Sequence, residues 1–232
     1  MNFFNGKSAL IRLILAFGIM GLVLTIMGFV DLGKDIGGSY SDFNYMKLTD
    51  FREGDIIKGT ITENLGQAAY IETTEYTFVV ETDKYTSSGY YVIPFFSSID
   101  APVPDKLMLY HTGNKTQMDR LDTLEGETDS YYFGETDGTR THVVVDRAEV
   151  VKMTEEEKQY FLSYIKEYID WLYDGYGYDT SEIYDLYIQH IVPYVVKYNA
   201  GGGSWMLGVG VTILGIMAVV FVIYLIKSRS ID

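Results

Sequence analysis

Hydrophobic positions follow three patterns along this chain. Residues 13–30 and 205–226 form uncharged apolar runs of 18 and 22 residues. Between them, residues 55–153 contain short runs that alternate with a period of two, which is typical of strands. From residue 154 the apolar positions repeat at helical spacing instead. The pattern predicts two membrane helices flanking a domain of class α+β.

The two apolar runs have the length of membrane-spanning helices. A helix of 22 residues is roughly 33 Å long and matches a hydrocarbon core of about 30 Å. The first run also has the basic start of a secretory signal peptide, with Lys7 and Arg12. However, it exceeds the usual apolar region of such a peptide, and no A-x-A-like cleavage site follows. We therefore expect an uncleaved anchor.

Charge predicts the orientation of the two helices. Lys7 and Arg12 precede the first run, while Lys227 and Arg229 follow the second. Short basic flanks stay in the cytoplasm. Residues 31–204 contain 14 Lys and Arg but 31 Asp and Glu, so their formal charge is -17. We expect a two-pass plasma-membrane protein with both termini cytoplasmic and 31–204 extracytoplasmic.

The middle segment begins with strand-like runs rich in Val, Ile, Tyr and Phe. Strands are predicted at 55–63, 67–73, 75–82, 89–96, 105–112 and 140–153. Five or six short strands in about a hundred residues fit a small antiparallel barrel or sandwich. We favour an OB-like barrel, with Pro94 marking an edge strand or a bulge.

Two helices are predicted after this β-rich part. Thr154 and Glu157 form a capping box, and the helix that they start ends at Gly175. A second helix begins near Asp179, and Pro193 kinks or ends it. The predicted divisions are a tail (1–12), a membrane helix (13–30), a linker (31–48), the β-rich domain (49–153), a Tyr-rich helical pair (154–199), a Gly-rich joint (200–204), a membrane helix (205–226) and a tail (227–232).

No motif in the sequence specifies a reaction. Cysteine is absent, which excludes disulfides, thiolate metal sites and a cysteine nucleophile. His111, His142 and His190 have no second histidine at metal-binding spacing, so structural roles are favoured over a base or a ligand. No G-x-S-x-G or P-loop pattern occurs in the domain. We expect no catalytic residues and no cofactor.

Two acidic segments, both predicted as loops, are the weak candidates for a cation site. One contains Asp174, Asp179 and Glu182, and the other covers residues 122–129. Calcium takes six to eight oxygen ligands, and neither segment has the spacing of an EF-hand loop. Solvated surface acids are the alternative interpretation.

Tyrosine is the most unusual feature of the composition. Ten of the 21 tyrosines lie in 154–198, and Tyr160, Tyr164 and Tyr168 share one helix face. Such a stripe suits recognition of a protein or a sugar. Alternatively, the rings cover the β-rich domain and keep only their hydroxyls at the rim.

Small residues form a stripe on each membrane helix. They allow the close backbone approach that drives helix association in lipid. We therefore predict that the helices pack on each other, or on a partner, through Gly18, Gly21, Thr25 and Gly28 on the first helix and Gly208, Thr212 and Gly215 on the second.

The segments "LTDFREGDIIKGTI" and "YYVIPFF" resemble uncharacterised membrane proteins of Gram-positive bacteria. The resemblance rests on Phe51, Gly54, Asp55, Gly59 and the "YYVIP" run. It implies two membrane helices around an extracytoplasmic β-rich domain and brings no known activity.

The expected function is a non-catalytic one. We expect a membrane-anchored accessory module that binds another membrane or cell-envelope component, with the lipid bilayer as its surroundings and no nucleic acid as a partner. The alternative is an enzyme or receptor for an envelope polymer that uses acids and tyrosines in a cleft. A flat aromatic patch would favour the module, and a deep pocket with paired acids or a histidine–acid pair would favour the alternative.

Overall fold

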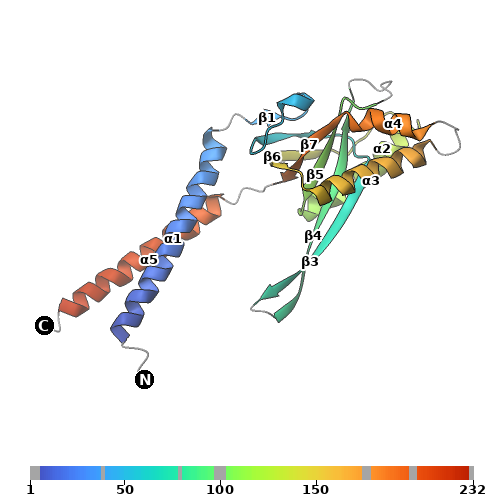
Figure 1. Ribbon diagram of the computed structural model, residues 1–232. Helices are drawn as coiled ribbons and strands as arrows, with labels where there is room; N and C mark the ends of the chain where they lie inside the picture. Colours follow the sequence, from blue (N-terminus) through green and yellow to red (C-terminus); the bar gives the residue numbers. More distant parts are fainter. Residues whose placement is uncertain are drawn as a thin grey trace. The chain divides into compact units, whose positions relative to one another are not determined.

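The computed structural model describes residues 6–37, 40–77, 80–96, 103–173, 179–198 and 203–229. The chain divides into two compact units. One unit comprises 1–39 and 201–232, and the other comprises 40–200. Figure 1 shows the helices of the first unit and the sheet of the second.

The first unit consists of two apolar helices, α1 (Gly6–Gly37) and α5 (Gly203–Arg229). Their segments Arg12–Val30 and Met206–Tyr224 are long and apolar enough to cross a membrane. A Cβ atom added to Gly210 would lie 2.6 Å from the backbone nitrogen of Thr25. The two backbones therefore approach so closely at this point that only glycine fits.

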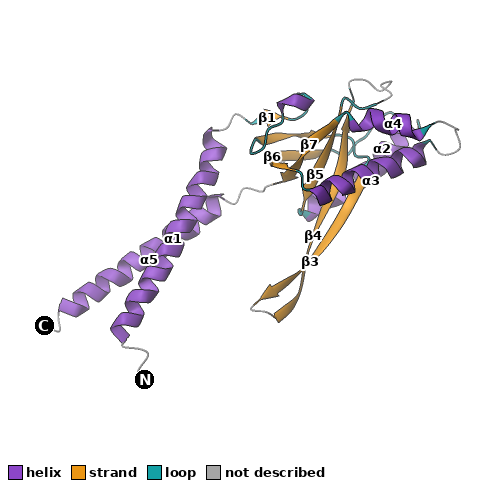
Figure 2. Ribbon diagram, in the orientation of Figure 1, coloured by secondary structure: helices purple, strands orange, loops and turns teal. Residues whose placement is uncertain are grey.

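The second unit is built on one seven-stranded mixed sheet (Figure 2). Pairing is parallel between β1 and β2 and between β5 and β7, and antiparallel elsewhere. In spatial order the strands are β1 (Ser41–Asp42), β2 (Ile56–Ile61), β6 (Val143–Lys152), β7 (Ile191–Tyr198), β5 (Lys106–Thr112), β4 (Val80–Phe95) and β3 (Gly66–Thr77).

The mixed α and β composition agrees with the sequence analysis, but the OB-like barrel is not confirmed. The sheet order places β1 and β3 at opposite ends. The predicted strand 75–82 is wrong, because β3 runs to Thr77 and β4 begins at Val80. These strands form a long hairpin, and β4 pairs with β5 only over residues 89–95.

Helices cover both faces of the sheet. On one face, α2 (Lys115–Tyr132) contacts β4 and β6 and buries Met118, Leu121 and Leu124 in an apolar cluster with residues of these strands. The short 3-10 helix η1 (Leu48–Asp50) lies on the same side. On the other face, α3 (Glu155–Leu172) and α4 (Thr180–Ile188) cover a second apolar cluster. The central strands β5 and β7 and the adjoining part of β4 contribute residues to both clusters and are therefore buried on both sides.

The helix α2 occupies the segment 122–129, which the sequence analysis treated as an acidic loop. Asn114 caps its first turn by accepting a hydrogen bond from the Gln117 backbone at 3.2 Å. Buried Leu121, Leu124 and Thr128 give it an inward face. Asp122, Gly126 and Asp129 obscured this periodicity, because Asp and Gly have low helix propensity.

The predicted helix through Pro193 is also wrong beyond residue 188. The chain turns at residues 189–190 and continues as β7, which inserts between β5 and β6. Val192, Val195 and Val196 are buried, and β-branched side chains suit a central strand. Pro193 is exposed and lies where the β5–β7 register shifts, so its missing N–H is tolerated.

Candidate functional site

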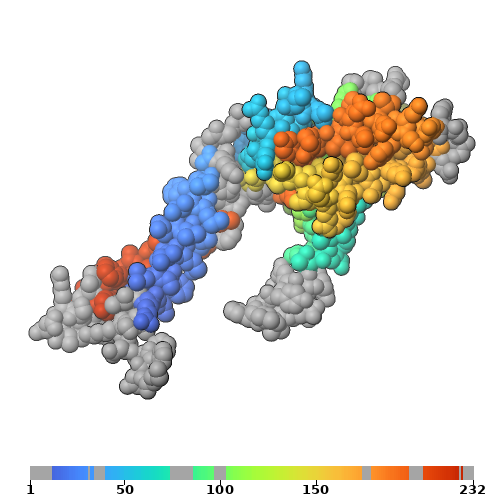
Figure 3. Space-filling model, in the orientation of Figure 1, coloured from blue at the N-terminus to red at the C-terminus, as the bar shows by residue number. Residues whose placement is uncertain are grey.

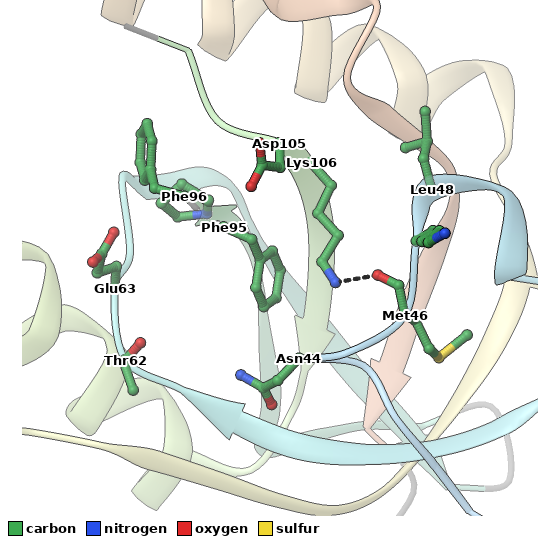
Figure 4. Close-up of a pocket in the computed structure, with 11 residues that line it drawn as sticks. Asn44, Met46, Leu48, Thr62, Glu63, Phe95, Phe96, Asp105 and Lys106 are labelled. Carbon is green, nitrogen blue, oxygen red and sulfur yellow. Dashed lines mark hydrogen bonds between the residues drawn. The ribbon is translucent and has the colours of Figure 1, made fainter. Parts of the chain in front are cut away.

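A pocket of about 540 Å³ lies beside the first residues of β5 (Figure 4). Its walls come from the loop after β1, the residues after β2, the C-terminal end of β4 and the N-terminal end of β5. The lining residues include Asn44, Glu63, Phe95, Asp105 and Lys106. Acidic and basic side chains and the aromatic rings of Phe95 and Phe96 therefore line the same pocket.

Lys106 is the unusual residue of this pocket. It is 4% exposed, and its ammonium donates hydrogen bonds to the carbonyl oxygens of Phe43 and Met46, the latter at 2.6 Å. Its nitrogen also lies 4.4 Å from the centre of the Phe95 ring. Burial lowers the pKa of Lys106 to about 8, although nearby carboxylates such as Asp42 oppose this. The lysine therefore clamps the loop after β1 onto the sheet.

A second feature lies where α2 and α3 end. Phe133, which caps the C-terminus of α2, contacts Trp171 near the end of α3 with ring centres 5.8 Å apart and almost perpendicular planes. The two side chains are 59% and 54% exposed. Trp171 also contacts Tyr168, with ring centres 5.9 Å apart. Large exposed aromatic residues that adjoin one another are typical of recognition sites.

Two carboxylates continue this feature along α2. Glu125, Asp129 and Phe133 are spaced by four residues, while Tyr164, Tyr168 and Trp171 occupy positions i, i+4 and i+7 of α3. We call the combined set the acidic–aromatic surface, made of Glu125, Asp129, Phe133, Tyr164, Tyr168 and Trp171. Burial raises the pKa of Glu125, as do the charges of Asp129 and Asp122. The pKa of Asp129 is raised by burial as well.

The three tyrosines singled out on α3 have different surroundings. Tyr160 is half-buried and bonds to Glu156 one turn earlier. Tyr164 donates to the Leu65 carbonyl at 2.5 Å and stacks on Tyr168, which is buried. The helices α3 and α4 form a continuous surface on the face shown in Figure 3. Only part of the stripe is therefore available at the surface.

Asp179 and Glu182, two of the three acids of the weak cation site predicted after α3, lie among the described residues. Asp174 lies outside them. Asp179 caps α4, and its carboxylate accepts a hydrogen bond from the Ser181 backbone at 2.9 Å. Glu182 is an exposed acid in the first turn of that helix. Within the described ranges, no three His, Asp or Glu side chains are grouped to hold a metal.

Each histidine lies in a different place. The ring of His111 lies on that of Tyr90, with centres 4.4 Å apart. Burial lowers the pKa of His111, and the charge of Lys197 acts in the same direction. His190 contacts the Asp105 carbonyl through Nδ1 at 3.0 Å. His142 is exposed just before β6.

Beside His111 lies an ion pair between buried Glu157 and half-buried Lys197 that the sequence analysis did not identify. Glu157 binds Lys197 at 2.8 Å and accepts a hydrogen bond from Tyr90 at 2.9 Å. It also completes the capping box with Thr154. Burial would raise the pKa of Glu157, but Lys197, the Thr154 backbone and Tyr90 lower it to about 2. This network holds the start of α3 on the sheet.

The small residues of the membrane helices are only partly brought together. Gly21 faces Gly210 and Ile213, Thr25 lies against Gly210, and Gly28 is buried. In contrast, a Cβ added at Gly18, Gly208 or Gly215 would have no neighbour within 4 Å. Thr212 is exposed and bonds within its own helix to the Gly208 carbonyl. The close contact on α5 thus uses Gly210, which the predicted stripe omitted.

Comparison of the chain with known protein families, curated proteins and solved structures finds no match.

Proposed function

We propose that this chain is a two-pass membrane protein that presents residues 40–200 outside the cytoplasm as a binding module. Supporting the anchor are the two apolar helices and the basic residues at their outer ends. The high negative charge of the middle segment agrees with its export, because it lacks the excess of Lys and Arg that retains loops inside.

The exposed contact between Phe133 and Trp171 carries the proposal of binding. Tryptophan and other aromatic residues dominate the energetics of protein interfaces, because each ring buries a large area with little loss of freedom. Here the two rings are already held in contact by separate helices. A partner that covers them gains apolar burial without ordering either helix.

Site-specific photocross-linking in the native cells tests this function. A photoreactive phenylalanine analogue at Trp171 should form a discrete cross-linked product with a membrane or envelope protein. The same analogue at Tyr45, which is 87% exposed, should not form that product. Phe133→Ala should reduce the yield at residue 171, because it removes half of the aromatic contact. Equal yields at residues 171 and 45 would refute the proposal.

A second function, binding of a small ligand, is favoured by the pocket at Lys106. Its volume of about 540 Å³ lies within the range of ligand sites. A compound that binds in this pocket must contact Phe95 and the side chain of Lys106. It should raise the melting temperature of the wild type but not of Lys106→Met. Equal stabilisation of the two proteins would exclude this pocket as its site.

A further inference from the structure

The acidic–aromatic surface consists of a row from α2 and a row from α3, which cover opposite faces of the sheet and meet beside its edge strand β3. A Cβ atom built at Gly66 would overlap the Tyr164 hydroxyl and lie 2.7 Å from Oε1 of Glu125, so these two side chains lie close together. Tyr168 continues the row on α3, and its ring stacks on that of Tyr164 with centres 6.4 Å apart. At the end of the rows, Phe133 meets Trp171. The row on α2 from residue 125 to residue 133 is about 12 Å long at ~1.5 Å per residue. This length suits a short segment of polypeptide.

The acidic end of this surface has an excess of negative charge. Within the residues that the structure describes, Glu125 and Asp129 form no ion pair with Lys or Arg. Glu167, an exposed acid of α3, adds a third charge near Tyr164. The fold therefore holds partly buried carboxylates close together. A cation supplied by a partner would stabilise their negative charge.

We infer that the acidic–aromatic surface binds a basic segment of a partner protein. This inference rests on the proposed function and specifies the chemistry of the partner. Apolar side chains of the segment cover Phe133 and Trp171, while its Lys or Arg residues lie against Glu125, Asp129 and the half-buried ring of Tyr164. Aromatic faces beside carboxylates attract cations through both charge and ring quadrupole. The charge of -17 on 31–204 repels acidic partners and anionic lipid surfaces.

Binding of designed peptides to the full chain in phosphatidylcholine nanodiscs tests the inference. The probes are three labelled 12-residue peptides that alternate Lys with Leu, Glu with Leu, and Lys with Ser. Fluorescence anisotropy gives their affinities, and empty nanodiscs provide the blank. Trp205→Phe leaves Trp171 as the sole tryptophan of a chain that has two, so its emission reports contact directly.

The Lys–Leu peptide should bind and shift the emission of Trp171, and each of the other two should bind at least tenfold more weakly. Glu125→Gln with Asp129→Asn should weaken the Lys–Leu peptide at least tenfold. The matched control, Glu53→Gln with Asp119→Asn, removes two exposed acids and should change the affinity less than threefold. Circular dichroism should show that both pairs of substitutions leave the domain folded.

The result that overturns the inference is Lys–Leu binding that Glu125→Gln with Asp129→Asn leaves unchanged. If Phe133→Ala with Trp171→Ala still abolishes that binding, the aromatic site of the proposed function stands and only the basic partner is wrong. Absence of binding of the Lys–Leu peptide also overturns the inference. Binding of the chain to vesicles of anionic lipid instead of this peptide overturns it as well. Failure of the photocross-link at residue 171 would refute the proposed function itself.

Discussion

Lys106 gives a prediction whose sign and size follow from its burial. The pKa of Lys106 falls from 10.5 to about 8 in the folded protein, chiefly because burial disfavours the charged form. Between these two pH values the unfolded chain holds a proton that the folded chain has released. Stability therefore rises as the pH increases from about 8 to 10.5. The substitution Lys106→Met removes this dependence.

The size of the effect follows from the same two values. The difference between 10.5 and about 8 corresponds to about 3.4 kcal/mol. Water at the pocket screens the charge, so we expect roughly half of this, about 1.7 kcal/mol. The free energy of unfolding of the wild type, minus that of Lys106→Met, should increase by this amount from pH 7.5 to pH 10.5.

Urea unfolding of the fragment 40–200 provides the assay. This range is one of the two compact units, so we expect it to fold alone with the circular dichroism of a mixed α/β protein. Lys58→Met, which removes an exposed lysine, controls for the loss of one charge. A pH-independent difference between wild type and Lys106→Met would refute the reasoning. A difference that shrinks with rising pH would show that the two carbonyls and Phe95 hold the ammonium more strongly than burial opposes it.

Two further predictions concern the membrane helices and the start of α3. Gly21→Cys with Ile213→Cys should form a disulfide, because a Cβ built at residue 21 lies 3.2 Å from that of Ile213, and a slight separation of the helices reaches the roughly 3.5–4.5 Å that a disulfide spans. Adding Gly210→Leu should prevent this disulfide, whereas adding Gly215→Leu should not. Non-reducing electrophoresis of proteolytic fragments detects the disulfide, and equal effects of the two substitutions would exclude this helix contact. The pKa of Glu157 is lowered from 4.5 to about 2, so its contribution to stability should be lost as pH falls through this range. Glu157→Gln should flatten that acid limb of the stability curve, and an unaltered limb would assign it to other groups.

The sequence predicted those elements whose local signals agree with their burial. The capping box of Thr154 and Glu157 is confirmed at the start of α3, and the apolar spacing after it matches the buried face. In contrast, β7 was missed because Pro193 suggested a broken helix. Its place in the centre of the sheet depends on pairing with β5 and β6, which are distant in the sequence.

The acidic–aromatic surface illustrates what sequence reasoning missed. Assignment of 122–129 to a loop hid the four-residue spacing of Glu125, Asp129 and Phe133. The apolar spacing of Met118, Leu121 and Leu124 indicates a helix, and recognising that helix would have revealed the four-residue spacing. The contact of Phe133 with Trp171 joins two helices across the fold, and no local pattern specifies it. Similarly, only the packed helices distinguish Gly210 from Gly208 and Gly215.

The membrane topology is the claim on which the account of function depends most directly. The chain has no cysteine, so single cysteines report accessibility without background. Tyr45 is highly exposed in the proposed external domain, and Ile231 lies beyond the second apolar helix. An impermeant maleimide should label Tyr45→Cys in intact cells and Ile231→Cys only after the cells are opened. Labelling of Ile231→Cys in intact cells, or protection of Tyr45→Cys, would contradict the account.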